Sequence, residues 1–391
     1  MIEERDPAAF MAAFARAVGG TERVFLADPS WGPSERSALS RLVGAGPSSA
    51  GPGWLMIPSG GTGGELKFAR HDEATISAAV RGFCEHFGVT RVNCIGVLPL
   101  HHVSGLMAWM RAALTGGRYL PWDWKRLEAG DFPVLPAPAG RRSPQREGWY
   151  LSIVPTQLQR LLVSAGPGAS DAVKWMRAFD AVFLGGGPVW PELASAAECA
   201  SVPISLVYGM TETAAMVSAQ HPAEFLAGDR GCGSPMPHAR IELTSAGLVR
   251  ISGESVFRGY YPAWSDSREI TTGDLGSIDD RGRLRILGRN DAVIITGGKK
   301  VDPSEVEAAL RATGEFSDIA VVGLPDTEWG QVVAACYPDG GRPDLARAAA
   351  SIDSLAAYKR PRRFIPIADW PRNAQGKLNR AEIVRRAVSR P

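Results

Sequence analysis

Short apolar runs alternate with longer amphipathic stretches over the first two-thirds of the chain. The apolar runs predict β-strands and the amphipathic stretches predict helices, a rhythm typical of an α/β protein. Each predicted strand ends close to a glycine or proline, and α/β sheets bind ligands at such strand ends. The predicted strands cover residues 92–98, 150–154, 181–184 and 204–208, and the predicted helices cover 71–87, 104–114, 156–163 and 191–200.

After Gly231 the pattern changes to short alternating strands joined by tight turns, which predicts two β-hairpins. The hairpins are expected at residues 240–252 and 276–287, and their pattern ends at residues 288–291. An acidic N-cap, a proline and a glutamate then begin a helix at Asp302. The sequence therefore predicts a large N-terminal α/β domain with a β-rich hairpin segment, residues 1–290, and a small C-terminal α+β domain, residues 291–391.

The composition fits a globular protein with more than one domain. The chain has 391 residues, too many for one core of ordinary size, of which 45% are hydrophobic and 21% charged. No apolar run reaches the roughly 18 residues of a membrane-spanning helix, and the N-terminus lacks the pattern of a secretory signal. We therefore expect a cytoplasmic protein with no membrane partner, and the sequence leaves a homo-oligomer open.

The formal net charge is only +2, which does not favour a general polyanion binder. Residues 342–391 nevertheless carry twelve Lys/Arg and four Asp/Glu, a local charge of +8. Such a segment could bind nucleic acid or close over the phosphates of a nucleotide, and no RNA-binding aromatic motif accompanies it. Nucleic acid is therefore not an expected partner. The five scattered cysteines, none at CxxC spacing, indicate neither a disulfide framework nor a structural zinc site.

A glycine-rich loop follows the apolar residues 54–57. Glycines let backbone N–H groups approach an anion and the hydroxyls add donors, so the loop fits a triphosphate. Glu65 stands where a Walker motif needs lysine, and a plain surface turn is the alternative interpretation. The candidate phosphate-binding residues are Ser59, Gly60, Gly61, Thr62 and Gly63.

Two acids and a run of glycines lie near predicted strand ends. Glu212 is a hard oxygen ligand of the type that Mg²⁺ takes, or alternatively an exposed acid at a helix start. Asp274 lies in the glycine-containing segment 272–276, which predicts a turn where its carboxylate accepts hydrogen bonds from ribose hydroxyls, or else a plain Asx-turn. The glycines of 185–187 leave bare backbone against which an adenine could lie.

Taken in order, these segments resemble the motifs of the acyl-adenylate-forming ligases, the family of acyl-CoA synthetases, carrier-loading adenylation domains and luciferases. The resemblance spans residues 58–377, and it implies an acyl-CoA synthetase-like fold whose small mobile C-terminal domain carries a catalytic lysine. It also implies Mg²⁺ as cofactor and ATP, coenzyme A and a small-molecule carboxylic acid as reactants. The matching segments are the glycine-rich loop, 185–188, 208–213, 272–276, 288–291, 297–305 and 373–377.

The resemblance implies a role for each matching residue. Lys377 is similar to the lysine of the adenylation step, Thr211 and Glu212 to residues that contact phosphate and Mg²⁺, and Asp291 to the hinge of the small domain. Coenzyme A is expected at Gly297, Gly298 and Lys299. The nucleotide is expected to contact Gly185, Gly186, Gly187, Tyr208, Gly209, Met210, Asp274 through its ribose, and Arg289.

Departures from the family pattern narrow the resemblance. The family's loop reads Ser-Gly-Thr-Thr-Gly-x-Pro-Lys, whereas here Gly61 replaces one threonine, no proline follows and Lys67 is displaced by one position, so its role stays open. The chain is also short for the family. Together with residues 98–107 and 154–162, these features resemble the o-succinylbenzoate–CoA ligases of menaquinone and phylloquinone biosynthesis.

O-succinylbenzoate carries two carboxylates and an aryl ketone, so its site needs a cationic or polar group for the carboxylate that does not react. Arg111 lies seven residues after Ser104 on the same expected helix face, so it could reach the same side. The alternative for Arg111 is an exposed helix charge, and the alternative for His102 is a hydrogen-bonded turn residue. The candidate acyl-substrate residues are His102, Ser104, Arg111 and Gln157. A metal site at His101 and His102 is not expected, because adjacent side chains should point apart and no further ligand cluster is visible.

The sequence thus predicts an acid–thiol ligase that uses ATP and Mg²⁺ to convert o-succinylbenzoate to its acyl-adenylate and then forms a thioester with coenzyme A. Alternatives within the family are a ligase for another aryl or acyl carboxylate and a stand-alone carrier-loading enzyme. A nucleotide-binding regulatory module without activity is the alternative of another class. The joint presence of Glu212, Asp274, Arg289 and Lys377 speaks against it.

Overall fold

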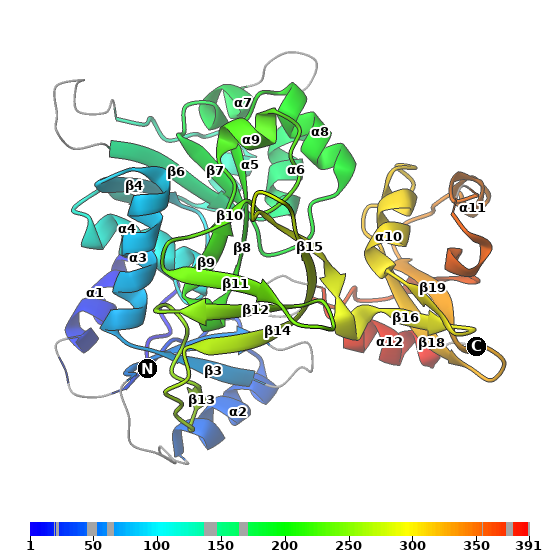
Figure 1. The fold of residues 1–391 in the computed structure, drawn as a ribbon, viewed down its shortest axis with the longest axis horizontal. Coiled ribbons are helices and arrows are strands. Elements are labelled where there is room, and N and C mark those ends of the chain that lie inside the picture. Colours follow the sequence, from blue (N-terminus) through cyan, green and yellow to red (C-terminus); the bar gives the residue numbers. More distant parts are fainter. Residues whose placement is uncertain are drawn as a thin grey trace.

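The computed structural model describes residues 1–18, 20, 23–44, 53–60, 66–136, 147–163, 171–353, 355–372 and 378–389. Figure 1 shows a large N-terminal part, in which helices surround a central sheet, and a smaller C-terminal part of strands and helices beside it. The predicted fold class is therefore confirmed, whereas the domain boundary after residue 290 stays a prediction.

A seven-stranded sheet forms the centre of the N-terminal part, in the strand order β10-β9-β8-β7-β6-β4-β5. The strands from β5 to β8 are parallel, and β9 and β10 each run antiparallel to their neighbours. The four apolar runs of the sequence become β4, β6, β7 and β8, as predicted. The strand bounds are β4 (Arg91–Gly96), β5 (Tyr119–Pro121), β6 (Glu147–Ile153), β7 (Ala181–Leu184), β8 (Ile204–Met210), β9 (Ala215–Ala219) and β10 (Ser234–Pro235).

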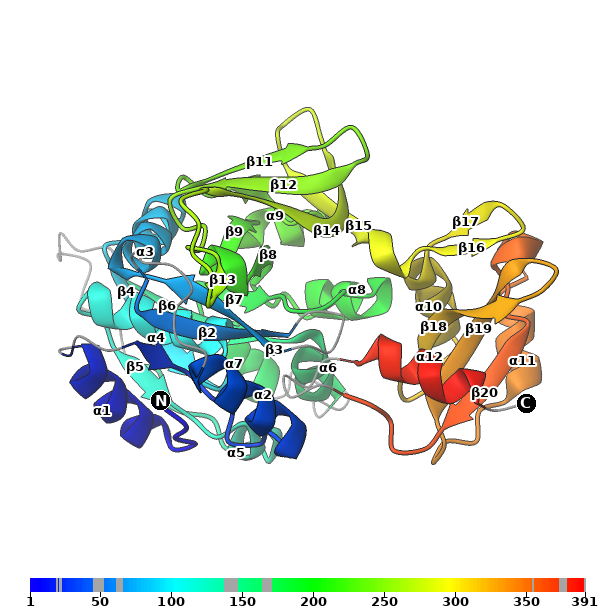
Figure 2. The same cartoon turned by 90° about the horizontal axis from the view of Figure 1, so that it is seen from below.

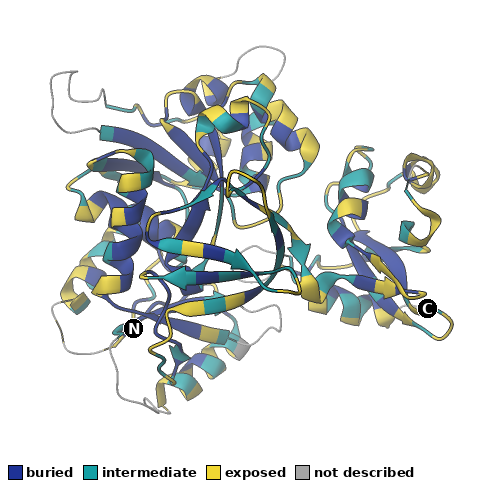
Figure 3. Cartoon of the chain, in the orientation of Figure 1, coloured by how far each residue is buried: buried dark blue, intermediate teal, exposed yellow. Residues whose placement is uncertain are grey.

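Helices cover both faces of this sheet, and successive strand residues point to opposite faces. Tyr150 packs into one core with α1, α3 and α4, whereas the next residue, Leu151, packs into a second core with the helices of the other face. Figure 3 shows the buried central strands between helices whose outer sides are exposed. The helices are α1 (Pro7–Val18), α3 (Glu73–Phe87) and α4 (Val103–Leu114) on the first face, and α5 (Trp124–Glu128), α6 (Pro155–Val163), α7 (Asp171–Met176), α8 (Pro191–Cys199) and α9 (Pro222–Leu226) on the second.

The start of α3 corrects the helix predicted from residue 71. His71 is the last residue of a strand, and Asp72 caps the helix by accepting a hydrogen bond from the Thr75 N–H at 2.8 Å. A capping acid with extended backbone ends the strand and begins the helix at one residue. His71 is therefore a strand residue, and this places it beside the functional site.

Two smaller sheets complete the N-terminal part. The first has the order β1-β2-β3-β13 beside α2 (Pro33–Gly44), and the second is antiparallel with the order β11-β12-β14-β15, which confirms both predicted hairpins. The bounds are β1 (Val24–Phe25), β2 (Leu55–Gly60), β3 (Leu66–His71), β13 (Tyr260–Tyr261), β11 (Ala239–Leu243), β12 (Leu248–Gly253), β14 (Glu269–Ile278) and β15 (Leu284–Arg289).

The turn predicted at residues 272–276 is wrong, because these residues lie within the ten-residue strand β14. Hydrogen-bonded neighbours on both sides, β12 and β15, hold the segment extended in spite of its two glycines. Asp274 is paired in register with Arg289 of β15. The acid therefore stands on a sheet and not in a loop.

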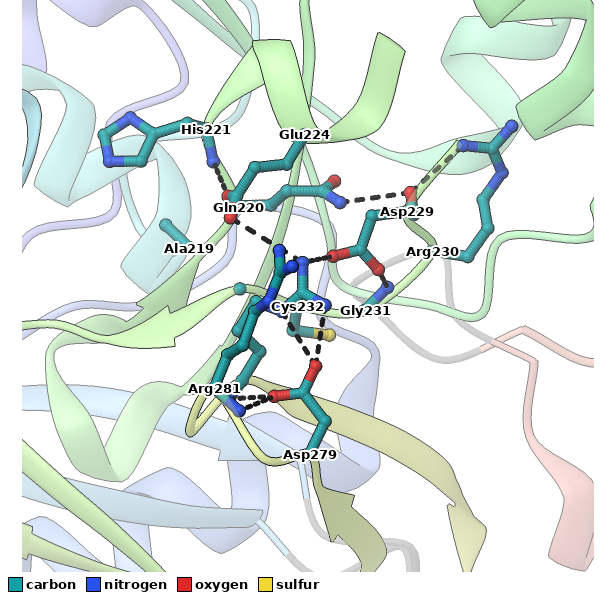
Figure 4. A network of polar contacts seen from close by, with 12 residues as sticks. Ala219, Gln220, His221, Glu224, Asp229, Arg230, Gly231, Cys232, Asp279 and Arg281 are labelled. Carbon is teal, nitrogen blue, oxygen red and sulfur yellow. Dashed lines mark hydrogen bonds and ion pairs between the residues drawn. The ribbon is translucent and has the colours of Figure 1, made fainter. Parts of the chain in front are cut away.

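A polar network attaches the β14–β15 hairpin to the central sheet. Arg283, at the hairpin turn, donates to Asp279 of the same turn at 2.8 Å and to Asp229, in the loop after α9, at 2.5 Å. Figure 4 shows the carboxylates of Asp229 and Asp279 directed at the same place from two different elements. This contact fixes one end of a hairpin whose other end carries Asp274 and Arg289.

The C-terminal part contains a two-stranded hairpin, β16–β17, and a three-stranded sheet of order β18-β19-β20 (Figure 2). Val321 faces α10 and α11, and the next residue, Val322, faces α12. Asp302 caps α10 as predicted, accepting from the Ser304 N–H at 2.9 Å. No helix in the described ranges combines the length and apolarity that crossing a membrane requires. The bounds are β16 (Ile294–Thr296), β17 (Lys299–Val301), α10 (Pro303–Arg311), β18 (Ala320–Asp326), β19 (Gly330–Pro338), α11 (Leu345–Ser351), β20 (Arg363–Ile367) and α12 (Arg380–Val388), with 3-10 turns η1 (Thr211–Thr213), η2 (Asn290–Ala292) and η3 (Ala357–Lys359).

Candidate functional site

The turn after the central strand β8 places a buried carboxylate at the carboxyl edge of the sheet. Glu212 is 3% exposed and lies in the 3-10 turn η1. Gly209 is needed just before this turn, because a Cβ there would lie 1.8 Å from the Ala215 carbonyl oxygen of the neighbouring strand. The alternative that Glu212 is an exposed helix-start acid is therefore wrong.

Groups distant in sequence hold this carboxylate in place. The hydroxyls of Ser59 and Tyr260 each donate to Oε1 of Glu212 at 2.6 Å. The backbone N–H of Phe257 donates to the Glu212 carbonyl at 2.8 Å. Burial, together with the adjacent carboxylate, raises the pKa of Tyr260, so this phenol keeps its proton and acts as a donor.

The Glu212 carboxylate suits the Mg²⁺ that the resemblance implies. Oε1 is engaged by two hydroxyls, whereas Oε2 has no hydrogen-bond partner within the described ranges. Mg²⁺ is commonly bound by one or two carboxylates together with substrate phosphates. A hard anionic oxygen, fixed in position and beside the glycine-rich segment, fits this requirement.

We expect Tyr260→Phe to raise the Mg²⁺ concentration needed for half-maximal activity by a few-fold, because a neutral hydrogen bond contributes about 1 kcal/mol. The measurement is pyrophosphate release as a function of Mg²⁺ concentration. Tyr358→Phe, at an exposed position, is the matched control. An unchanged Mg²⁺ curve in Tyr260→Phe would contradict the idea that this phenol orients Glu212.

His71 holds the backbone of the same turn. Its Nε2 lies 2.8 Å from the Thr211 carbonyl oxygen, so this nitrogen carries the proton and donates, and its Nδ1 lies 3.1 Å from the Thr75 hydroxyl. Burial lowers the pKa of His71 to about 4, and the ring is therefore neutral at physiological pH. Thr211 is thus fixed through its backbone by a residue of β3.

We expect the free energy of unfolding to fall as the pH is lowered from about 6.5 to about 4. The unfolded chain protonates His71 near its ordinary pKa of about 6.5, whereas the folded chain keeps it neutral down to about 4, so the unfolded state binds more protons in this window. His238, whose pKa burial also lowers to about 4, adds to this slope. Urea unfolding at about pH 7 and about pH 5 measures the effect, and His71→Gln should reduce the difference. An undiminished difference in that variant would count against this assignment.

Lys67 lies close to this group in spite of its displaced sequence position. It is the register partner of Ser59 in the β2–β3 pair, and its ammonium lies 5.6 Å from the centroid of the Tyr260 ring. The hairpin therefore puts Lys67 beside the residues that hold Glu212. A cation at this point is suited to bind a phosphate. The sequence left the role of Lys67 open, and this position favours phosphate binding.

A second group of residues joins the central sheet to the β14–β15 hairpin. The Tyr208 hydroxyl donates to Oδ2 of Asp274 at 2.6 Å, and Arg289 approaches Oδ1 at 3.4 Å. Arg289 also binds Asp291 through two hydrogen bonds of 2.9 and 2.7 Å. The Asp291 hydrogen bonds, together with the Asp274 carboxylate, raise the pKa of Arg289. The structure thus brings together three residues expected at the nucleotide, Tyr208, Asp274 and Arg289, and Asp291, which is expected at the hinge.

The glycines of residues 185–187 follow β7 as expected and are partly or fully exposed. A Cβ on Gly185 would lie 2.7 Å from a methyl group of Val207, and Gly186 has a φ of +78°. A side chain at either position would therefore crowd or strain this strand end. Bare backbone remains at the carboxyl edge of the sheet, as an adenine platform requires.

The residues expected at the acyl substrate have different environments. Ser104 is exposed in the first turn of α4 and His102 is the half-buried N-cap of that helix. Gln157 accepts a hydrogen bond from the Val154 N–H at 3.1 Å and so satisfies the start of α6. Their contact with a substrate stays a prediction.

Arg111 is not the exposed helix charge that was the alternative, since it is only 3% exposed. Its guanidinium lies 4.5 Å from the centroid of the Phe83 ring, and its Nε has no hydrogen-bond partner among the residues that the structure describes. Burial lowers the pKa of Arg111 to about 10, so it remains a cation at neutral pH. Within the described part of the chain, no carboxylate forms an ion pair with it. An uncompensated buried cation is costly, and an anionic ligand would compensate it.

The expectation that His101 and His102 point apart without a further ligand is wrong. Their Nε2 atoms lie 3.3 and 3.7 Å from the same oxygen of Asp28, Oδ2. The chain turns between these histidines and α4, since His102 has the extended backbone of an N-cap, and both rings therefore face Asp28. This segment after β1 carried no sequence pattern that marked it.

Several expected residues lie outside these groups. Gly61, Thr62, Gly63 and Lys377 lie outside the described residues, although Arg372 and Leu378, which flank the lysine segment, form an antiparallel bridge. Gly297 and Gly298 form the β16–β17 turn with φ of +52° and +74°, and Lys299 is exposed after it. Their roles stay predictions.

Comparisons with known proteins agree with this geometry. A family model described as AMP-binding enzyme matches residues 53–261, and a model of the AMP-binding enzyme C-terminal domain matches residues 305–377. The chain belongs to the AMP-binding enzyme family. Among curated relatives of this AMP-binding enzyme, the probable 2-succinylbenzoate–CoA ligase of Mycobacterium tuberculosis is 30% identical over 401 residues, covering 97% of this chain and 95% of the relative. The 2-succinylbenzoate–CoA ligase of Enterococcus faecalis is 30% identical over 345 residues, covering 83% of this chain and 67% of the relative.

The fold of the AMP-binding enzyme is shared with solved structures. The o-succinylbenzoate-CoA synthetase MenE of Bacillus subtilis in complex with the acyl-adenylate OSB-AMP superposes with a TM-score of 0.72 at 24% identity, covering 85% of this chain and 69% of that one. The same synthetase has been solved with ATP and a magnesium ion, with a TM-score of 0.68 and 23% identity, covering 85% and 70% of the two chains. These likenesses establish the fold.

Proposed function

We propose that this AMP-binding enzyme uses ATP and Mg²⁺ to activate o-succinylbenzoate and then transfers the acyl group to coenzyme A. The observation that carries the proposal is the placement of Glu212 directly after β8 and of Asp274 against Tyr208 of the same strand, in a chain whose curated relatives include 2-succinylbenzoate–CoA ligases. One relative matches at 30% identity over nearly the whole of both chains. An oligomeric state and a cytoplasmic location remain predictions.

The first half-reaction brings a carboxylate against an anionic phosphate. A carboxylate oxygen of the acid bonds to the α-phosphorus of ATP, the bond to the bridging oxygen breaks, and pyrophosphate leaves. Mg²⁺, when bound, would neutralise phosphate charge, and Glu212 is the residue that would hold it. Ser59 and Tyr260 fix the direction of that carboxylate, and Asp274 would accept hydrogen bonds from the ribose.

The Asp274 carboxylate needs a change of partner to bind the ribose. Tyr208 now donates to Oδ2 at 2.6 Å, and Arg289 lies at 3.4 Å from Oδ1. The Arg289 contact is the longer of the two, and the same guanidinium is bound by Asp291. We propose that a nucleotide displaces this long contact and that Arg289 then turns toward the nucleotide.

We propose Arg111 as the group that binds the spectator carboxylate of o-succinylbenzoate. Three properties support this role: the guanidinium is buried, it retains its charge, and no described carboxylate pairs with it. The Phe83 ring beneath the guanidinium supplies an aromatic surface in the same region. His102, Ser104 and Gln157 remain candidates for further contacts with the acid.

We expect Arg111→Met to raise the KM for o-succinylbenzoate by about 10- to 100-fold, because a hydrogen bond to a charged group contributes about 1.5–3 kcal/mol. The KM for ATP should not change. Methionine retains much of the volume, and Arg118→Met, at an exposed position, is the matched control. An aryl acid without the second carboxylate should not distinguish variant from wild type. Equal losses with both acids would contradict the proposed contact.

We propose that residues 291–391 form a domain that rotates about Asp291 between the two half-reactions. In the present arrangement α10 faces residues 188–191 across a cavity of about 220 Å³, and the Arg311 guanidinium lies 5.6 Å from the centroid of the Trp190 ring. Such an interface would be remade when the domain rotates during turnover. Gly297, Gly298 and Lys299 are the proposed coenzyme A contacts in the rotated arrangement.

The proposal is tested by incubating the purified full-length chain with o-succinylbenzoate, ATP, Mg²⁺ and coenzyme A. Pyrophosphate release without coenzyme A reports the adenylate, and mass spectrometry of the thioester reports the second step. A parallel panel of aryl and fatty acids, and an assay for loading of a carrier protein, measure the alternatives. Pyrophosphate release with another acid but not with o-succinylbenzoate would overturn the substrate assignment, and absence of release with every acid would overturn the activity.

A further inference from the structure

A cluster of two histidines and one aspartate lies outside the residues that hold Glu212 and Asp274. Asp28 follows β1, the edge strand of the smaller sheet, whereas His101 and His102 lie between β4 of the central sheet and α4. Asp28 is 3% and His101 is 7% exposed, and His102 is half-buried. The three ligand atoms lie within 4.8 Å of one another.

The two Asp28–histidine distances in this cluster are close to those between ligands of one tetrahedral metal ion. Zinc binds nitrogen and oxygen at about 2.0–2.2 Å, so two ligand atoms at the tetrahedral angle lie roughly 3.3–3.5 Å apart. The separations between Oδ2 of Asp28 and Nε2 of His101 and of His102 are 3.3 and 3.7 Å.

The second oxygen of the aspartate is already fixed. Oδ1 of Asp28 accepts hydrogen bonds from the backbone N–H of Ser30 at 2.8 Å and from its hydroxyl at 2.6 Å. Such outer hydrogen bonds orient a ligating carboxylate in metal sites.

We propose that Asp28, His101 and His102 form a binding site for a divalent transition-metal ion of the zinc class. Imidazole and carboxylate ligands suit Zn²⁺ and Co²⁺, whereas Mg²⁺ takes oxygen ligands, so this site and the one at Glu212 select different ions. Three protein ligands leave a fourth tetrahedral position open. An ion bound here ties the segment after β1 to the start of α4.

Metal binding by the full-length protein tests the proposal without reference to activity. Chelator-treated protein is titrated with Co²⁺, whose visible ligand-field absorption reports tetrahedral coordination, and Zn²⁺ is then added in competition. We expect one ion per chain, displaced by Zn²⁺ and not by an equal concentration of Mg²⁺. Absence of a saturable site with one ion per chain would overturn the proposal.

Variants locate the ion. Asp28→Asn, His101→Gln and His102→Gln should each weaken Co²⁺ binding at least tenfold, whereas His221→Gln, at an exposed histidine elsewhere, should not. His102→Gln is the variant least prone to folding defects, because this residue is only half-buried. Circular dichroism checks that each variant is folded. Binding that survives all three substitutions, or that depends on His221, would also overturn the assignment.

Discussion

Lys377→Ala is expected to reduce adenylate formation by at least about a hundredfold while leaving thioester formation from supplied acyl-adenylate nearly intact. The acid carboxylate must approach an anionic phosphate, and each like-charge pair at about 4 Å costs roughly 4 kcal/mol at an effective dielectric of 20. An ammonium group at that point offsets the repulsion where charge develops, and removal of one such group commonly costs a factor of about 10²–10³. In the second step the thiol attacks the acyl carbon and AMP leaves, so this cation has no comparable task.

The two half-reactions are measured separately. Pyrophosphate release without coenzyme A reports the first, and thioester formation from synthetic acyl-adenylate reports the second. Lys174→Ala is the matched control, because Lys174 is an exposed lysine on α7 that pairs with Asp171 at 3.2 Å. Equal loss of both half-reactions in Lys377→Ala would contradict the division of tasks between the two domain positions.

The sequence predicted the central elements because their signals are local. The apolar runs that became β4, β6, β7 and β8 are buried on both faces, and the alternating segments became the β11–β12 and β14–β15 hairpins. Asp302 capped the predicted helix of the C-terminal part. Each of these signals depends on residues that are neighbours in the chain.

The turn predicted around Asp274 was wrong for a long-range reason. A Cβ on Gly273 would lie 2.7 Å from Nη2 of Arg289, so this glycine makes room for the guanidinium of the neighbouring strand. Glycine thus serves a close contact here and not a turn. The sequence therefore assigned the backbone of this segment incorrectly.

The sequence proposed the acids of the candidate site together with Ser59 and Tyr208, whereas Tyr260 and His71 were missed. Ser59 and Glu212 are 153 positions apart, and hydrogen bonds from Tyr260 of β13 and from His71 of β3 reach the same turn. No local pattern marks a tyrosine or histidine whose partner lies in another sheet. The same holds for Asp28, and for the burial of Arg111, which a charged residue on an amphipathic helix does not suggest.

Glu212→Gln is expected to reduce adenylate formation by about a hundredfold and to raise the Mg²⁺ concentration needed for half-maximal activity. Glutamine retains the shape of the side chain, and its amide oxygen can still accept from Ser59 and Tyr260, so the fold of η1 should be kept. The anionic oxygen that Mg²⁺ prefers is lost, and with it the compensation of phosphate charge during pyrophosphate departure. The measurement is a Mg²⁺ titration of pyrophosphate release, with Glu254→Gln, an exposed acid paired with Arg81, as control. A wild-type Mg²⁺ curve in the Glu212→Gln variant would show that this carboxylate does not hold the ion, because the other contacts of the side chain are preserved.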